Sequence, residues 1–150
     1  MTVRKSVTLT RPRLLLAEDH PGMRDRVVQM IENTFDVVGV VGDGGALLEA
    51  AARMKPDVCV IDISLPGMSG IEAAIQLRDT RSPARIVFLT MHEDPDYLRA
   101  ALAAGATAYV VKSRMASDLC IAIKDALAGR LFVSASVPYV TQNDHGEDVP

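Results

Sequence analysis

The sequence alternates five times between a short apolar run and a longer segment of helical periodicity, and this alternation limits the fold more than any other feature. The apolar runs are rich in aliphatic and β-branched side chains, as is typical of strands buried on both faces. The predicted strands are residues 14–17, 37–41, 58–61, 85–89 and 108–111. The predicted helices are residues 21–33, 47–54, 71–79, 95–105 and 119–127. Strands joined through helices form parallel sheets with helices on both faces, so the pattern predicts a doubly wound α/β fold.

Proline, glycine and serine mark the ends of several predicted helices. Pro21 suits the first turn of a helix. Gly105 and Gly129 suit the position that follows a helix, where glycine is favoured. Ser113 or Ser117 is expected to cap the start of the last helix.

The composition is that of a globular protein with a core of ordinary size. The chain has 150 residues, of which 49% are hydrophobic and 23% charged, which predicts a single folded domain. The formal net charge of −3 argues against a nucleic-acid-binding surface in this chain. No apolar run is long enough for a membrane-spanning helix, so no membrane contact is expected. Cys59 and Cys120 lie in apolar patterns without metal-ligand spacing, which predicts buried free thiols in a reducing cytoplasm.

The two ends of the chain differ in composition from the middle. Residues 1–11 are polar and basic and are interpreted as a flexible N-terminal arm, whereas residues 12–130 contain all five strand–helix units. Residues 131–150 are interpreted as a C-terminal extension or the start of an interdomain linker, because their composition becomes polar and acidic toward the end. A short extended piece is expected at residues 131–133.

Polar side chains stand where four of the predicted strands end. Glu18 and Asp19 follow the first strand, Asp62 the third, Thr90 the fourth and Lys112 the fifth. In an open parallel sheet, ligands bind at the edge formed by the carboxyl ends of the strands, so these side chains are expected to converge. Three neighbouring carboxylates repel one another unless a cation lies among them. Because the candidate ligands are all oxygen atoms, a hard cation such as Mg²⁺ is predicted.

Each of these residues taken alone has a simpler explanation: a strand terminator for Asp62, a helix cap for Thr90 and a solvated strand end for Lys112. The ordered set is specific, and from about Arg13 to Gly129 the chain resembles the receiver domain of two-component response regulators. The motifs that carry the resemblance are Glu-Asp at 18–19, Asp-Ile-Ser-Leu-Pro-Gly-Met-Ser-Gly at 62–70, Leu-Thr-Met-His-Glu at 89–93, and the lysine that follows Gly-Ala-Thr-Ala-Tyr-Val-Val at 105–111. The resemblance implies a flavodoxin-like (CheY-like) fold with five parallel strands in the order 2-1-3-4-5.

The resemblance also implies a phosphoacceptor beside a metal ion. Asp62 is the expected phosphoacceptor, taking a phosphoryl group from a phosphohistidine on a sensor histidine kinase. The side chains of Asp19 and Asp62 and the backbone carbonyl of Ser64 are expected to bind Mg²⁺, with Glu18 acting through a water molecule.

Thr90, Lys112 and Tyr109 are the expected switch residues. Lys112 and Thr90 are expected to contact the phosphoryl oxygens. Thr90 drawn toward the phosphoryl group leaves space into which Tyr109 is expected to turn, changing the face made by the fourth helix and the fifth strand. The protein is accordingly expected to be a signalling switch and not an enzyme, catalysing only its own phosphorylation and dephosphorylation.

Two positions depart from the family pattern. The family often has proline, joined by a cis bond, after the lysine, whereas this chain has Ser113. A cis bond before a residue other than proline costs about 3–4 kcal/mol, so either the bond is trans or the site stores strain. Glu18 stands where the family more often has aspartate, and Mg²⁺ binding is expected to survive this change.

The sequence after the last predicted helix bears on the output of the switch. Gly-Arg-Leu-Phe-Val-Ser at residues 129–134 resembles the end of receivers in the NarL/FixJ group, which have a LuxR-like helix-turn-helix DNA-binding domain as output. The expected protein is thus a receiver whose DNA-binding domain is absent from this chain, with a homodimer formed on phosphorylation through the first and fifth helices or the fourth-helix face.

Two other functions stay open at this point. The chain could be a stand-alone receiver that acts by phosphotransfer or protein contact. It could also be an unrelated flavodoxin-like protein that binds flavin or hydrolyses a substrate. A haloacid-dehalogenase-type phosphatase is disfavoured, because it needs an acidic residue where this chain has Ser64.

Overall fold

The computed structural model describes residues 10–138, and no helix in that range is long and apolar enough to span a membrane. The expected N-terminal arm lies outside these residues except for its last two positions. The acidic end of the chain also lies outside them.

The strands form one parallel sheet in the order β2-β1-β3-β4-β5-β6. They are β1 (Arg13–Ala17), β2 (Asp36–Val41), β3 (Val58–Asp62), β4 (Arg85–Thr90), β5 (Ala108–Val111) and β6 (Phe132–Val133). The predicted order 2-1-3-4-5 is confirmed, and the short extended piece expected at residues 131–133 forms β6 at the edge of the sheet. The chain after the last helix returns to the free edge of β5, where Phe132 pairs with Ala108 and Val133 with Tyr109. The short strand pairs backbone groups that a sheet edge otherwise leaves open.

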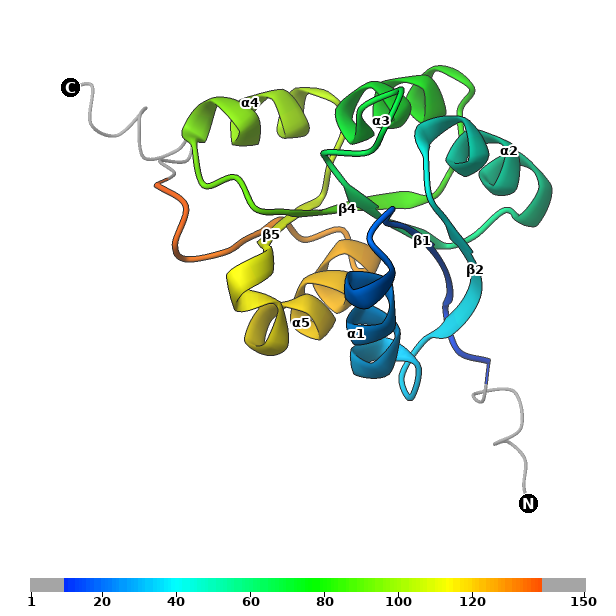
Figure 1. Cartoon of the computed structure of the whole chain (residues 1–150), viewed down its shortest axis with the longest axis horizontal. Coiled ribbons are helices and arrows are strands. Elements are labelled where there is room, and N and C mark those ends of the chain that lie inside the picture. The colour runs from blue at the N-terminus through cyan, green and yellow to red at the C-terminus, as the bar shows by residue number, and fades with distance from the viewer. Residues whose placement is uncertain (1–9, 139–150) are drawn as a thin grey trace.

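Five α-helices cover the two faces of this sheet. They are α1 (Pro21–Ile31), α2 (Gly44–Met54), α3 (Gly70–Asp79), α4 (Pro95–Ala103) and α5 (Met115–Leu127). Figure 1 shows α1 and α5 on one face and α2, α3 and α4 on the other. The fold is therefore the predicted doubly wound arrangement.

The core has two layers because successive side chains of a strand point to opposite faces. Leu14 and Leu16 of β1 belong to the hydrophobic cluster under α1 and α5. Leu15 and Ala17 belong to the cluster under α2, α3 and α4. Both clusters are fully buried along β1, which explains why this strand appears in the sequence as an unbroken apolar run.

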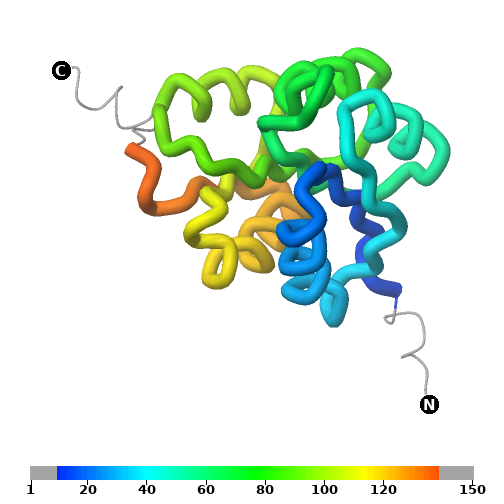
Figure 2. The backbone as a smooth tube through the Cα atoms, viewed as in Figure 1, coloured from blue at the N-terminus to red at the C-terminus, as the bar shows by residue number. Residues whose placement is uncertain are grey.

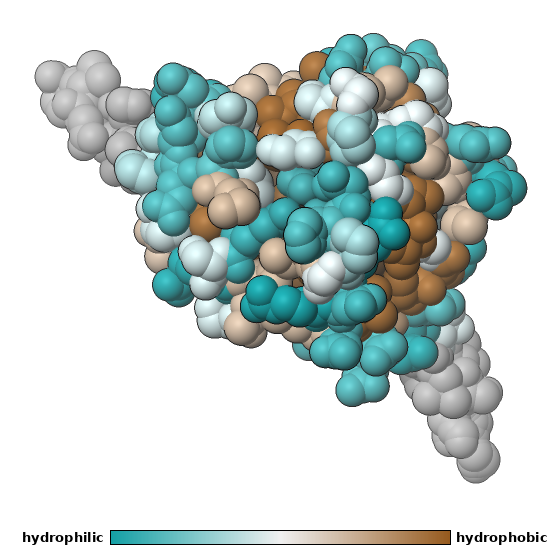
Figure 3. All heavy atoms as spheres, viewed as in Figure 1, coloured by the Kyte–Doolittle hydropathy of each residue, from teal (hydrophilic) through white to brown (hydrophobic). Residues whose placement is uncertain are grey.

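The surface carries both hydrophilic regions and hydrophobic patches, as Figure 3 shows. Figure 3 shows hydrophilic side chains gathered over the middle of the face that Figure 1 presents. Among the described residues, the exposed large hydrophobic side chains are Val40, Met91, Tyr97, Ile121 and Leu131.

The start of α5 differs from the prediction. A 3-10 turn, Lys112–Arg114, leads directly into the helix, and Arg114 occupies the N-cap position without a side-chain cap bond. Ser113 lies in that turn, and Ser117 lies inside α5, where its hydroxyl donates to Asp118 Oδ1 at 2.8 Å. The predicted serine caps are therefore wrong, because the chain begins to coil immediately after β5 and leaves no extended residue for a serine to occupy.

Gly70 allows α3 to begin directly against the end of β3. A Cβ at this position would lie 2.3 Å from the Asp62 carbonyl oxygen and 2.9 Å from both Ile61 Cγ2 and Ile63 Cα. The Gly70 amide donates to the Ile63 carbonyl at 2.8 Å, which closes the loop. Glycine is thus required here to keep the loop after Asp62 tight.

We expect Gly70→Ala to lower the free energy of unfolding by at least about 2 kcal/mol, because the methyl group meets backbone atoms that must shift. Gly45→Ala in the first turn of α2 is the matched control, since its Cβ would meet only Asp43 Oδ1 at 3.5 Å. Urea denaturation of both variants measures the difference. Equal stability of the two variants would contradict this, since it would show that the loop after β3 can shift to accommodate the methyl group without loss of stability.

Candidate functional site

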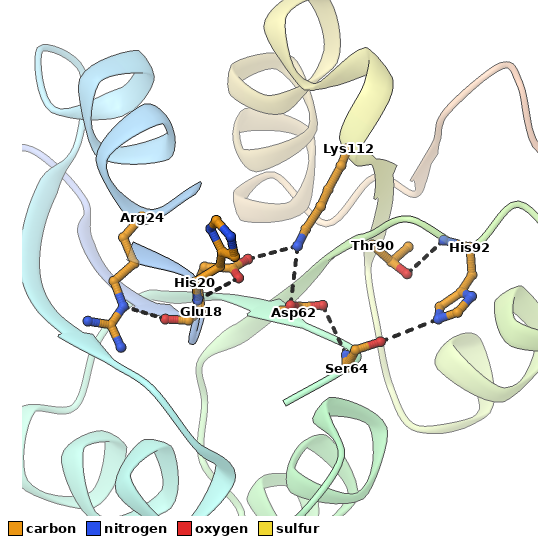
Figure 4. A network of polar contacts seen from close by, with 8 residues as sticks. All are labelled: Glu18, His20, Arg24, Asp62, Ser64, Thr90, His92 and Lys112. Atoms are coloured by element: carbon orange, nitrogen blue, oxygen red, sulfur yellow. Dashed lines mark hydrogen bonds and ion pairs between the residues drawn. The ribbon is translucent and has the colours of Figure 1, made fainter. Parts of the chain in front are cut away.

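Three charged side chains meet at the carboxyl edge of the sheet. Asp62 is the last residue of β3, Glu18 follows β1 and Lys112 follows β5. Lys112 Nζ lies 3.2 Å from Asp62 Oδ2 and 3.0 Å from Glu18 Oε1, as Figure 4 shows. The Asp62 and Glu18 side chains are 6% and 1% exposed, and that of Lys112 is 12% exposed. Both ion pairs thus form where the dielectric screening of water is weak.

Asp19 completes a cluster of three carboxylates. One oxygen each from Glu18, Asp19 and Asp62 lies within 4.8 Å of the other two. Glu18 and Asp62 are buried while Asp19 is exposed, so the cluster reaches solvent at Asp19. The predicted convergence of the acidic pair with Asp62 and Lys112 is therefore present in the structure.

The electrostatics of this cluster keep Lys112 charged. Burial alone would lower the pKa of Lys112, but its contacts with Glu18 and Asp62 raise that pKa above its usual value. Burial raises the pKa of Glu18 more than the contact with Lys112 lowers it, and the charge of Asp62 raises it further. One ammonium group thus offsets two closely spaced carboxylates.

The donor atoms of this cluster fit a hard divalent cation. All of them are oxygen, and Mg²⁺ binds through one or two carboxylates while retaining several water molecules. Glu18 Oε1 is buried and accepts no hydrogen bond, although the ammonium of Lys112 lies near it. An oxygen with this spare capacity suits a metal-bound water, as expected for Glu18.

The backbone around Glu18 is fixed by neighbouring segments. The Glu18 amide donates to the Val41 carbonyl at 2.9 Å, and Glu18 Oε2 accepts from the His20 amide at 3.2 Å. Arg24 Nε donates to the Glu18 carbonyl at 2.6 Å, as Figure 4 shows. Arg24 was not predicted to belong to the site, since an arginine in a helix carries no motif of its own.

The loop after Asp62 is held to its carboxylate. Asp62 Oδ1 accepts from the Ser64 amide at 2.9 Å, a local side-chain-to-backbone bond that tightens the turn. Ser64 Oγ lies 3.3 Å from His92 Nε2. The loop after Asp62 is thereby linked to the loop between β4 and α4.

Thr90 and Tyr109 form a second group, centred on His92. The His92 amide donates to Thr90 Oγ1 at 3.0 Å, and the Tyr109 hydroxyl donates to the His92 carbonyl at 2.9 Å. The His92 ring stacks on Tyr97, with centroids 3.9 Å apart. No hydrogen bond joins Thr90 to Asp62 within the described part of the chain, so the two groups connect through Ser64 and His92. The motif around Thr90 contains His92, but a sequence does not show which residue will join two loops.

Tyr109 already occupies an inward position. Its side chain is fully buried, a point that the sequence left open. The hydrogen bond to the His92 carbonyl satisfies the hydroxyl in this position.

The peptide bond between Lys112 and Ser113 is trans. Of the two alternatives that the sequence left open at this position, the structure thus has the trans bond. The chain turns directly from β5 into the 3-10 turn that precedes α5.

The fold and the site together define a doubly wound α/β protein with an acidic pocket and a lysine at the carboxyl edge of its sheet. The chain belongs to the response regulator receiver domain family, whose model matches residues 14–124. This family consists of components of two-component signalling that act as switches.

Known relatives agree with this assignment. The probable transcriptional regulatory protein NarL of Mycobacterium tuberculosis is 32% identical over 127 residues, which are 83% of this chain and 59% of that protein. The chain thus spans less than two thirds of the length of this relative. A crystal structure of a LuxR-family two-component response regulator from Aurantimonas sp. SI85-9A1 superimposes with a TM-score of 0.82 at 34% identity, covering 94% of this chain and 100% of that one. A structure of two RcsB dimers bound to two parallel DNAs has a TM-score of 0.78 at 26% identity, covering 85% of this chain and 66% of that one.

We expect Tyr109→Phe to lower the free energy of unfolding by about 1 kcal/mol at neutral pH, because it removes the hydrogen bond to the His92 carbonyl. Burial raises the pKa of Tyr109 to about 12. The unfolded chain releases this proton near pH 10, so the native protein loses stability as the pH rises from about 10 to about 12. Tyr109→Phe has no hydroxyl to titrate, so it does not lose this part of its stability at alkaline pH.

Urea denaturation at a series of pH values measures both effects. Tyr97→Phe is the control, since it keeps the ring that stacks on His92 and removes only the hydroxyl of an exposed side chain. A Tyr109→Phe profile parallel to that of the unaltered protein above pH 10 would contradict the expected titration.

Proposed function

We propose that Asp62 accepts a phosphoryl group from a sensor histidine kinase and that its phosphorylation switches the conformation of this receiver. The single observation that carries the proposal is the meeting of the buried Asp62 carboxylate with the Lys112 ammonium and with the acidic pair of Glu18 and Asp19. A buried carboxylate with a fixed cation beside it and oxygen ligands around it has what phosphoryl transfer requires, namely positioning and charge stabilisation.

The chemistry follows from the two oxygens of Asp62. A carboxylate oxygen attacks the phosphorus of the donor phosphohistidine and forms a P–O bond as the P–N bond breaks, and the histidine nitrogen keeps the electron pair. The Ser64 amide and the Lys112 ammonium each hold one Asp62 oxygen, which fixes the plane of the carboxylate. Lys112 is also placed to contact a phosphoryl oxygen.

Asp19, Asp62 and the backbone carbonyl of Ser64 would hold Mg²⁺, with Glu18 bound through a water molecule. When bound, Mg²⁺ neutralises charge on the phosphoryl oxygens. The exposure of Asp19 leaves this side of the cluster open to the donor, while the burial of Glu18 fixes the opposite side.

Thr90 and Tyr109 supply the proposed switch. A phosphoryl group brings about −1.5 to −2 of charge to one point at the edge of the sheet. The Thr90 hydroxyl, which accepts from the His92 amide, keeps a proton to donate to a phosphoryl oxygen. Movement of Thr90 carries His92 with it, and the bonds of His92 to Tyr109 and Ser64 spread the change to β5 and the phosphoacceptor loop.

The output that we propose is a helix-turn-helix DNA-binding domain, supported by the likeness to NarL and to RcsB dimers bound to DNA. Phosphorylation would promote a homodimer, and DNA would be bound only through that further domain. A stand-alone receiver acting by phosphotransfer or protein contact is the alternative. A gene that continues beyond Pro150 into a helical domain would favour the receiver with a DNA-binding output over the stand-alone receiver. The free thiols of Cys59 and Cys120 suit the reducing cytoplasm in which we place the protein.

We expect acetyl phosphate with Mg²⁺ to add one phosphoryl group, seen as a single mass shift of the intact protein. Asp62→Asn abolishes this adduct, because an amide is a poor nucleophile, and removal of Mg²⁺ with a chelator prevents it. Asp79→Asn is the matched control, since Asp79 is an exposed carboxylate at the end of α3. An adduct that persists in Asp62→Asn would refute the assignment of the phosphoacceptor.

We expect Thr90→Ala to leave Asp62 able to accept the phosphoryl group while removing the response to it. Sedimentation velocity with and without beryllofluoride, a phosphoryl mimic, measures phosphorylation-dependent dimerisation. The control is Thr80→Ala, whose hydroxyl bonds only to the Leu77 carbonyl at the end of α3. Unchanged dimerisation of Thr90→Ala would show that Thr90 does not couple the phosphoryl group to the interface.

A further inference from the structure

The segment after α5 packs along the outer edge of β5. Residues 132–137, named the strap here, begin with β6 and run toward the side of the molecule on which α4 begins, as Figure 2 shows. The Phe132 amide donates to the Thr107 carbonyl at 3.1 Å, and the Ser134 amide donates to the Tyr109 carbonyl at 2.9 Å. The strap therefore holds the backbone of Tyr109 from outside the sheet.

Ser134 fastens the strap to two elements at once. It is 1% exposed, and its hydroxyl accepts from the Val111 amide at 3.0 Å and donates to Asp118 Oδ2 at 2.8 Å. Burial would raise the pKa of Asp118, but hydrogen bonds from Ser134 and Ser117, with Arg114 nearby, hold that pKa below its usual value. Asp118 on α5 is thus an ionised acceptor, and hydrogen bonds to charged groups are stronger than neutral ones.

The far end of the strap enters the core. Val137 is 5% exposed and belongs to the same hydrophobic cluster as Tyr109, Leu98 and Val111. The Val137 amide donates to the Ser134 carbonyl at 3.1 Å, so a turn brings the apolar side chain back onto the domain. The strap thus has a polar anchor at Ser134 and an apolar anchor at Val137.

We propose that the strap braces Tyr109 in its inward position and transmits the phosphorylation state of Asp62 to the residues after Pro138. Tyr109 is held at both ends: its hydroxyl bonds to the His92 carbonyl, and its own backbone carbonyl bonds to Ser134. The inward ring belongs to the same hydrophobic cluster as Val137. This inference rests on the proposed function, in which the loop of Thr90 and His92 responds to the phosphoryl group.

The coupling works in both directions. A strap that docks more tightly when Tyr109 is inward favours the inward ring, and the phosphoryl group favours the same arrangement through Thr90 and His92. Thermodynamic linkage then requires phosphorylation to tighten the strap, and a docked strap to strengthen binding of a phosphoryl mimic by the same factor.

Hydrogen exchange of the strap amides tests the first direction. With beryllofluoride and Mg²⁺ added, we expect the amides of Ser134 and Val137 to exchange about fivefold more slowly, a factor at the low end of typical coupling between sites. Unchanged or faster exchange on beryllofluoride binding overturns the proposal.

Ser134→Ala tests the second direction. It removes the hydroxyl that joins Val111 to Asp118, so we expect faster exchange in the strap and about fivefold weaker beryllofluoride binding in an NMR titration. Ser136→Ala is the control, because Ser136 is an exposed residue of the same strap. Asp118→Asn, which keeps the size of the side chain, serves as a second variant should Ser134→Ala fail to fold. Equal beryllofluoride affinity of the folded variant and the control overturns the proposal.

The failure of this proposal differs from failure of the proposed function. If Asp62 takes no phosphoryl group from acetyl phosphate, the receiver function itself is wrong. If Asp62 is phosphorylated and the exchange of the strap does not change, only the coupling through the strap is wrong.

Discussion

The paired contacts of Lys112 with Asp62 and Glu18 are the interaction on which the rest of this structure depends. Two buried carboxylates so close together repel, and burial alone opposes the charge of each of them. One ammonium offsets both the repulsion and the burial of charge only if β1, β3 and β5 end at the same edge of the sheet. The parallel register of the strands brings their ends together in this way. The apolar runs of these strands and the tight loop closed at Gly70 are therefore part of the site, since they hold its charges in place.

The site has an inner and an outer part, joined by a short chain of contacts. Asp62 with its acidic neighbours and Lys112 form the inner part, which fits phosphoryl chemistry. Thr90 and Tyr109 form the outer part, and neither bonds to Asp62. Ser64 and His92 connect the two, because the histidine side chain reaches the loop after Asp62 while its backbone holds Thr90 and Tyr109. This chain of contacts is the route that we propose for a change of charge at Asp62 to reach β5.

The edge of the sheet beside Tyr109 carries a sixth strand beyond the five that the family resemblance implies. The chain after α5 covers that edge with β6 and anchors itself through Ser134, which is nearly inaccessible to solvent. The cover satisfies backbone groups of β5 that would otherwise offer a pairing surface. It also places Phe132 and Val133 directly against β5, the strand that carries Tyr109 and is followed by Lys112.

The sequence by itself determined the doubly wound fold and the meeting of Glu18, Asp19, Asp62 and Lys112, because apolar periodicity and the rule that parallel strands end together need no further information. The strand order came from the resemblance to the receiver family. Motif resemblance added the family and the expected roles. Only the tertiary structure decided that His92 joins two loops, that Arg24 and Ser134 fix backbone groups and that the Tyr109 ring is buried. It also decided that Lys112 and Ser113 share a trans bond and that the extended piece after α5 pairs with β5. Those outcomes depend on contacts between segments far apart in the chain, and local periodicity does not encode which distant atom a polar side chain will reach. The serine caps failed for a related reason, since the path of the chain out of β5 is set by packing and not by the capping preference of single residues.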